Sequence, residues 1–201
     1  MTVSLRERRR QMLYDEILLA MSALLAEKGY AAISMEELAA RVGISKPTLY
    51  SHFPTKEDIL IASIRDSLDR VAAIIDADRT QRSPLQQLSF ILKTVVQVQV
   101  NKGAPGPRPW SPEIIQVICT RQEVLDTFRN RERSILILVR EAIANGEIDA
   151  LLDPVLVMRT FYALLSALHA PFLSDMSPAN PRTVAETLAT IFERGVQAHE
   201  P

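Results

Sequence analysis

The stretch from Ser34 to Lys56, SMEELAARVGISKPTLYSHFPTK, predicts two short helices joined by a tight turn. Its opening serine is followed three residues later by Glu37. This is the spacing of a capping box, in which a hydroxyl and a carboxylate each satisfy a free backbone N–H group. Gly43 predicts the end of the first helix, because glycine adopts the left-handed conformation without steric cost. Ser45 and Pro47 then suit the cap and the first turn of a second helix.

The second of these helices is expected to have an inward and an outward face. Leu49 and Phe53 are predicted to point inward. The outward positions hold donors and acceptors that suit base edges and phosphates, and no carboxylate interrupts them; they are Lys46, Thr48, Tyr50, Ser51 and His52. Lys56 follows in the first turn of the next helix, where free N–H groups favour a phosphate. The alternative is an ordinary helical hairpin with a polar surface, but the joint pattern favours DNA binding.

These residues resemble the DNA-binding domain of TetR-type transcriptional regulators. The recognition region of that family typically reads G-[IV]-S-x-x-T-[LI]-Y-x-[HY]-F-x-x-K, and residues 43–56, GISKPTLYSHFPTK, follow it without departure. An amphipathic first helix, the pair GY and a hydroxyl residue before MEELA also match. The resemblance covers about residues 5–64, whereas the remainder matches only in length and helical character. It implies a homodimer that binds DNA through its N-terminal domain, and repression that a small molecule relieves.

The resemblance also implies which side chains contact DNA. Recognition helices direct their N-terminal residues into the major groove, so base reading is expected from Lys46, Pro47, Thr48 and Tyr50. Lysine suits guanine and proline suits a thymine methyl group. Phosphate contacts are expected from Ser34, Tyr50, His52 and Lys56, and Ser45 and Ser51 complete the expected DNA-binding set.

Charge gives partial support to a nucleic-acid partner. The 201-residue chain has a formal net charge of −1, and its first 60 residues hold eight Lys or Arg against eight Asp or Glu. Binding must therefore depend on how charge is distributed, because the usual basic footprint is absent. Four basic residues form a run just before the first predicted helix: Arg6, Arg8, Arg9 and Arg10. This run is either solvated or an arm or helix start that touches phosphates.

The single cysteine, Cys119, excludes an intrachain disulfide framework and suits a reducing cytoplasm. Its surroundings, IIQVICT, favour a buried thiol over a redox-sensing one. No stretch approaches the roughly 18 uncharged apolar residues of a membrane span, and the basic start MTVSLRERRR is unlike a signal peptide. We therefore expect a cytoplasmic protein with no membrane partner.

Apolar residues make up 47% of the chain, glycines number six, and no strand-like alternation occurs. This predicts an all-α fold of about nine helices. The resemblance implies that residues 1–55 form a three-helix DNA-binding domain and residues 56–201 a helical ligand-binding and dimerisation domain. The first helix is expected to end at Gly29, and residues 102–109, KGAPGPRP, to form a loop. The later helices are predicted at about 55–76, 84–101, 112–119, 122–145, 154–173 and 182–197.

The last two predicted helices, 154–173 and 182–197, carry apolar faces to spare. They either complete the monomer core or form a four-helix interface between two copies, and the resemblance favours the dimer. The C-terminal part also supplies aromatic and soft side chains for a mostly apolar small-molecule effector. The candidates are Phe90, Trp110, Phe128, Met158, Phe161, Tyr162, His169 and Phe172. Such residues belong more often to a core than to a pocket.

The sequence does not predict an enzyme, a cofactor or a metal site. Of three histidines, His52 belongs to the predicted recognition helix and His199 to the tail. His169 has no H-x-x-x-H or cysteine partner for a metal. P-loop, G-x-S-x-G and G-x-G-x-x-G motifs do not occur. The alternative to a regulator is a helical interaction scaffold without DNA binding, and salt-dependent binding to duplex DNA discriminates the two.

Overall fold

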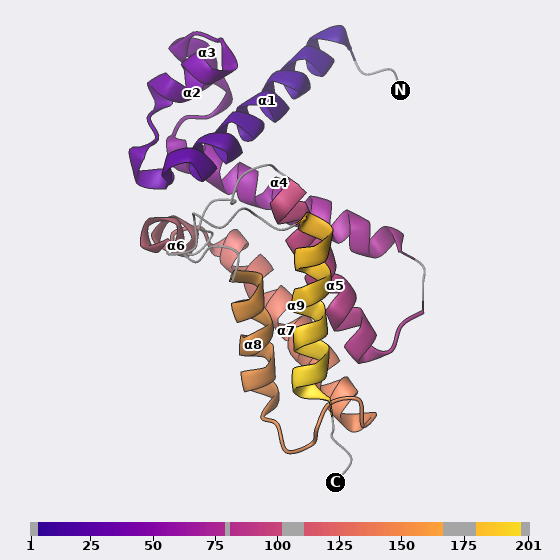
Figure 1. Cartoon of the computed structure of the whole chain (residues 1–201). Helices are drawn as coiled ribbons and strands as arrows, with labels where there is room; N and C mark the ends of the chain where they lie inside the picture. The colour runs from indigo at the N-terminus through magenta and orange to yellow at the C-terminus, as the bar shows by residue number, and fades with distance from the viewer. Residues whose placement is uncertain (1–3, 79–80, 102–110, 167–179, 198–201) are drawn as a thin grey trace. The chain divides into compact units, whose positions relative to one another are not determined.

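The structure is a computed structural model that describes residues 4–78, 81–101, 111–166 and 180–197 (Figure 1). Within these ranges the chain forms nine α-helices, one short 3-10 helix and no strand. The predicted all-α fold is thereby confirmed. None of the helices in the described ranges is long and apolar enough to cross a membrane.

The chain divides into two compact units, residues 1–69 with 106–124 and residues 70–105 with 125–201. These units are defined by packing within the chain. The functional boundary predicted after residue 55 stays a prediction.

The first unit has its core between the N-terminal helices. Its elements are α1 (Leu5–Lys28), the 3-10 turn η1 (Tyr30–Ala32), α2 (Met35–Val42), α3 (Lys46–His52), most of α4 (Lys56–Ala77) and α6 (Pro112–Cys119). Its buried side chains include Ile17, Met21, Leu24, Leu38, Leu49, Phe53, Ile59 and Leu60. Gly29 and Gly43 end α1 and α2 with φ of 77° and 76°, so both predicted glycine stops are confirmed.

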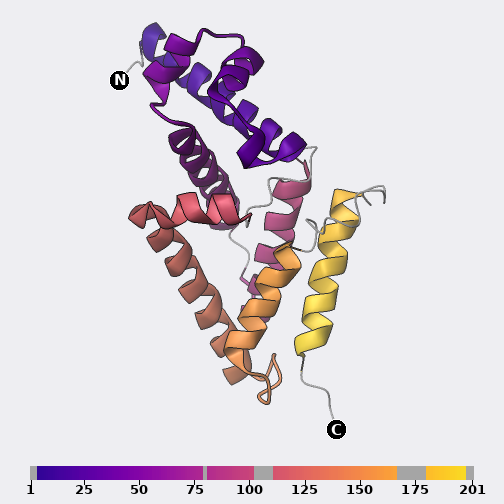
Figure 2. The ribbon, with the colours of Figure 1, turned by 90° about the vertical axis from the view of Figure 1, so that its left-hand side faces the viewer.

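The second unit packs its helices around an apolar cluster. Its elements are the end of α4, α5 (Pro84–Asn101), most of α7 (Gln122–Ala144), α8 (Pro154–Ser166) and α9 (Pro181–Val196). Figure 2 shows α8 and α9, orange and yellow, side by side. The rings of Phe161 and Phe192 meet edge to face at 5.6 Å in this cluster.

Local capping explains where the helices of the second unit begin. Ser83 and Gln86 exchange backbone and side-chain hydrogen bonds at the start of α5. The Asp153 carboxylate accepts the N–H groups of Val155 at 2.8 Å and Leu156 at 3.0 Å at the start of α8. Ser83 and Asp153 therefore act as the N-caps of α5 and α8. The predicted end of this helix and the predicted loop at 102–109 lie outside the described residues.

Two predictions about single regions are wrong. The arginine run does not precede the first helix, because α1 begins at Leu5 and includes it. The capping box of Ser4 and Glu7 sets this earlier start. Cys119 is exposed, not buried. The buried face of α6 consists of Ile114, Val117 and Ile118, and the following residue is rotated out of it.

Candidate nucleic-acid interface

The turn between α2 and α3 has the geometry of a helix-turn-helix unit. At the start of α2 the Ser34 hydroxyl accepts the Glu37 N–H at 3.2 Å. The other half of the predicted capping box is absent, because the Glu37 carboxylate forms an ion pair with Lys28 of α1 instead. At the end of α2, Gly43 adopts the left-handed conformation and Ile44 N–H donates to Ala39 O at 2.9 Å, which closes a Schellman turn.

Two inward anchors fix α3 on this scaffold. Leu49 is fully buried, and Phe53, which follows the helix, is 5% exposed. The Phe53 ring lies 5.0 Å from the ring of Tyr14 in α1. The predicted cap is confirmed, since the Ser45 hydroxyl accepts the Thr48 N–H at 3.3 Å. Because these contacts hold the inner face of α3, its other face is presented to the outside.

The predicted DNA-binding residues of α3 lie on this outer face to different extents. Lys46, Pro47, Tyr50 and Ser51 are exposed, whereas Thr48 and His52 are half-buried. Some hydroxyls already have partners at this helix. The hydroxyl oxygens of Ser45 and Thr48 lie 2.8 Å apart, and the Ser51 hydroxyl donates to the Thr48 carbonyl at 2.7 Å. A hydroxyl engaged in this way keeps acceptor capacity. The contacts expected from these residues stay predictions.

A carboxylate that the sequence reasoning missed lies beside the outer face. Glu36, in the first turn of α2, forms an ion pair with Lys46. The hydrogen bond from Lys46 holds the pKa of Glu36 below its usual value. No carboxylate occurs within α3 itself, but the turn brings one from ten residues upstream. In the sequence, the position of Glu36 at the polar start of α2 was the one local sign that a carboxylate could lie beside α3.

Lys56 is held by the first unit's own backbone. Its ammonium donates to the carbonyls of Ile33 at 3.0 Å and Tyr30 at 3.3 Å, and it lies 4.3 Å from the centroid of the Tyr30 ring. The Tyr30 hydroxyl donates to the Glu57 carboxylate at 2.8 Å. Burial and this hydrogen bond raise the pKa of Tyr30 far above its usual value. An ammonium has three donors, so one is left for the predicted phosphate contact.

The predicted ligand-binding residues that the structure describes have different surroundings, and their role stays a prediction. Phe161 is 1% exposed and belongs to the apolar core, against which Met158 and Tyr162 pack. Burial and the nearby charge of Glu132 raise the pKa of Tyr162 to about 12. Phe90 lies under the Arg82 guanidinium, 3.8 Å from its carbon to the ring centroid. Phe128 is half-buried, and Trp110, His169 and Phe172 lie outside the described residues.

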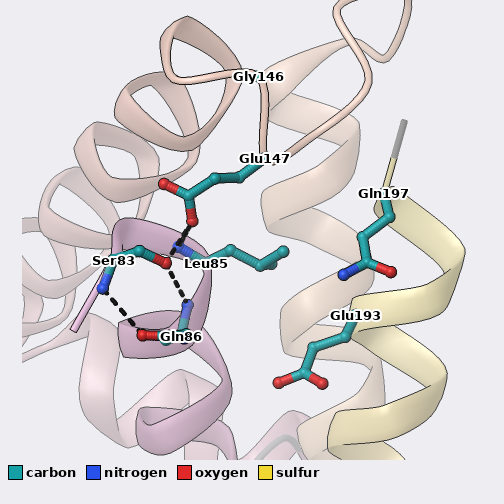
Figure 3. A pocket seen from close by; sticks show the side chains of 7 residues that line it. All are labelled: Ser83, Leu85, Gln86, Gly146, Glu147, Glu193 and Gln197. Carbon is teal, nitrogen blue, oxygen red and sulfur yellow. Dashed lines mark hydrogen bonds between the residues drawn. The ribbon is translucent and has the colours of Figure 1, made fainter. Parts of the chain in front are cut away.

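The second unit instead contains an open polar pocket of about 480 Å³. Its lining residues are Ser83, Leu85, Gln86, Gly146, Glu147, Glu193 and Gln197 (Figure 3). The Glu147 carboxylate accepts hydrogen bonds from the Ser83 hydroxyl and, at 3.0 Å, from the Leu85 N–H. This carboxylate therefore caps α5 from a distant loop. No cluster of His, Cys, Asp and Glu suited to a metal occurs among the described residues.

Residues 17–63 match the family model for "Bacterial regulatory proteins, tetR family". This segment, residues 17–63, is therefore a TetR-family domain. The transcriptional activator FasR of Mycolicibacterium smegmatis is 36% identical over 74 residues, 36% of this chain and 34% of FasR. The transcriptional repressor KstR of the same organism is 33% identical over 88 residues, 43% of this chain and 41% of KstR. The chain thus aligns with about a third to two fifths of the length of these curated relatives.

A solved structure extends the similarity of fold to the whole chain. The ketosteroid transcriptional regulator KstR2 of Mycobacterium tuberculosis superimposes with a TM-score of 0.73. The match covers 99% of this chain and 98% of KstR2, with 21% identical residues. The helical fold is therefore shared along the chain at this low sequence identity.

Proposed function

We propose that this protein is a cytoplasmic one-component transcriptional regulator that binds duplex DNA through α2 and α3. The observation that carries the proposal is the way Leu49 and Phe53 anchor one face of α3. The opposite face is left exposed and carries Lys46, Pro47 and Tyr50 near the helix N-terminus. A recognition helix reads bases through its N-terminal residues, so the exposed residues stand where base contacts are made.

The regulator is proposed to act as a homodimer on an inverted repeat. In α8 and α9 the large apolar side chains of Leu156 and Ile191 are 59% and 54% exposed. Both lie on the helices expected to pair with a second copy, and burial against that copy would remove them from water. A two-fold dimer reads two half-sites about one helical turn, roughly 34–36 Å, apart.

The effector is proposed to be a mostly apolar small molecule that releases DNA when it binds the second unit. KstR2 is named a ketosteroid regulator, and ketosteroids have this character. KstR is named a repressor and FasR an activator. Repression is the proposed mode here. We propose that a change in tilt of α4, which contributes to both units, moves the recognition helices off their spacing.

Binding of the effector and binding of DNA would be coupled by about 1–3 kcal/mol, and each would lower the affinity for the other by the same factor. Trp110 is the single tryptophan, so its fluorescence can report ligand entry. A ligand that quenched it but bound equally well with and without DNA would not be the effector.

The decisive experiment selects bound fragments from the source genome and measures their affinity against salt concentration. A regulator gives sequence-selective binding that weakens steeply as salt rises, because phosphate contacts release counterions. A helical interaction scaffold gives neither selection nor a salt slope. The latter result would remove the proposed function.

A further inference from the structure

The first two turns of α1 contribute nothing to the core of the first unit. Residues 4–12 are all exposed, and the first buried side chain of the helix is Ile17. The Ser4 N–H donates to the Glu7 carboxylate at 2.9 Å, and the Glu7 N–H donates to the Ser4 hydroxyl at 3.2 Å. This reciprocal cap maintains helix in a segment that packing does not support (Figure 1).

These two turns hold all the unpaired cations of the first unit's described part. Residues 4–69 and 111–124 contain ten Lys and Arg, of which six have a partner. The partnered contacts are Lys28–Glu37, Arg41–Glu27, Lys46–Glu36, Arg65–Glu123, Arg121–Asp58 and Lys56 with two carbonyls. The side chains of Arg6, Arg8, Arg9 and Arg10 form no ion pair or hydrogen bond within the described chain. A unit of balanced composition thus concentrates its free positive charge at one end of α1.

Three of the four arginines share one side of the helix. At 100° per residue, Arg6, Arg9 and Arg10 fall within an arc of about 100°, whereas Arg8 lies opposite. Further along α1, the buried Ile17 lies in the same arc, and the half-buried Tyr14 lies about 40° outside it, next to the position of Arg10. We call Arg6, Arg9 and Arg10 the arginine face.

The edge of the arginine face at Arg10 is on the side of α1 where α3 ends. Tyr14 contacts Phe53 directly after α3. At a rise of 1.5 Å per residue, Arg10 and Arg6 lie about 6 Å and about 12 Å further along the axis. The face therefore extends beyond the helix-turn-helix unit on the side of α3. The nearby acids compensate it only in part, since Glu7 caps the helix and Asp15 accepts from Gln11.

We propose that the arginine face binds the phosphates of DNA that flanks the bases read by α3. This inference rests on the proposed function and adds a second, non-sequence-specific contact to it. The guanidinium group suits the partner, because its planar set of donors matches a phosphate in two-point contacts. The capped helix presents three such groups already arranged, which lowers the entropy lost on binding.

The experiment compares full-length variants on two duplexes. The long duplex is a genomic fragment that the wild type selects, and the short duplex is the same site with its flanking base pairs removed. The test variant carries Arg6→Ala, Arg9→Ala and Arg10→Ala, and Arg8→Ala is the matched control on the opposite side of α1. Circular dichroism confirms folding, which α1 should retain because these residues are outside the core.

On the long duplex the wild type and Arg8→Ala should show equal, steep salt dependence. The triple variant should lose about 0.9 in the slope of log affinity against log salt for each phosphate contact, about 2–3 per protomer. Trimming the flanks should lower the slope of the wild type by a similar amount and leave the triple variant unchanged. The comparison of the wild type on the long and the short duplex tests the inference even if the triple variant fails to fold.

Equal slopes for all proteins on both duplexes would overturn this inference and leave the proposed function intact. Absence of any salt-dependent DNA binding by the wild type would instead remove the proposed function. Leu5 and Met12 are also exposed on α1 and offer a membrane alternative. If the arginines were needed for binding to phosphatidylglycerol vesicles but changed no DNA slope, the partner would be an anionic lipid surface and the inference would be wrong.

Discussion

Lys46 at the start of α3 is neutralised by Glu36 at the start of α2. To contact a base, the lysine must exchange this carboxylate for a guanine acceptor. The exchange favours the correct base pair, because other base pairs offer the lysine weaker hydrogen bonds in place of the lost ion pair. The carboxylate also repels phosphates and weakens binding to DNA in general.

Glu36→Gln should therefore raise affinity for random duplex more than affinity for the operator. The gain should stay below about tenfold, because exposed ion pairs are weak and screened. Lys46→Ala should relax preference at one base pair, as measured by competition between operator variants. Unchanged preference in Lys46→Ala would show that this lysine does not read a base.

Lys56 supports the fold as well as the proposed phosphate contact. Lys56→Ala leaves the Ile33 and Tyr30 carbonyls without their donor, so the free energy of unfolding should fall by about 1–3 kcal/mol. It should also weaken binding to all DNA sequences alike and lower the slope of log affinity against log salt by about one unit. Urea denaturation and filter binding measure the two effects. A fall in stability with no change in slope would limit Lys56 to a structural role.

Tyr30→Phe is the control for this cluster. It removes the hydrogen bond to Glu57 but keeps the ring beneath the Lys56 ammonium. It should lower stability by about 1 kcal/mol and leave the salt slope unchanged. A changed slope in this variant would mean that loss of packing, not loss of charge, explains the effect of Lys56→Ala.

The helix-turn-helix unit was predictable because its signals are local. Ser34, Gly43 and Ser45 each act on backbone groups within about one turn, so their spacing alone sets the ends of α2 and α3. Leu49 and Phe53 follow from helical periodicity in the same way.

Contacts between distant residues were not predictable on these grounds. The Glu37 carboxylate pairs with Lys28 and does not complete the capping box, because tertiary packing brings the two side chains together. Glu147 caps α5 across more than 60 residues, and Lys56 meets carbonyls 23 and 26 residues away. Pairings of this kind depend on how helices pack, which local pattern does not specify.

The proposed dimer interface can be tested at its exposed apolar side chains. Ile191→Glu and Leu156→Glu should each give monomers at micromolar concentration, because a buried unpaired charge opposes association. Leu188 is a poorer choice, since it packs partly against the monomer core. Leu151→Glu is the matched control, because Leu151 is 93% exposed and lies outside both helices. Sedimentation velocity measures the outcome, and a dimer in all three variants would place the interface elsewhere.

The exposed Cys119 should react readily with a thiol reagent in the native protein. Its rate should lie within about tenfold of the rate in urea, because exposure of the thiol largely sets access. Cys119→Ser should change the free energy of unfolding by less than about 0.5 kcal/mol, as expected for a surface position. Reaction only after unfolding would show that another part of the assembly covers α6.

The carboxylate of Glu147 should make stability depend on acid pH. Burial alone would raise its pKa, but hydrogen bonds from the Ser83 hydroxyl, the Leu85 N–H and Asn145 outweigh burial and hold the pKa below 4.5. A lowered pKa in the folded state stabilises the protein above the unfolded value of 4.5. This stabilisation is lost as pH falls through the lower folded value. Glu147→Gln should therefore flatten the decline in urea midpoint below about pH 5.

Glu193→Gln is the matched control for this prediction. Glu193 lines the same pocket from α9, but its carboxylate makes no hydrogen bond within the described chain (Figure 3). Its removal should leave the acid limb of the pH profile as steep as in the wild type. If both variants flattened the limb equally, a favourable electrostatic environment shared by the carboxylates of the pocket, and not the hydrogen bonds to Glu147, would explain the pH dependence. The cap on α5 would then contribute no stability through the ionisation of Glu147.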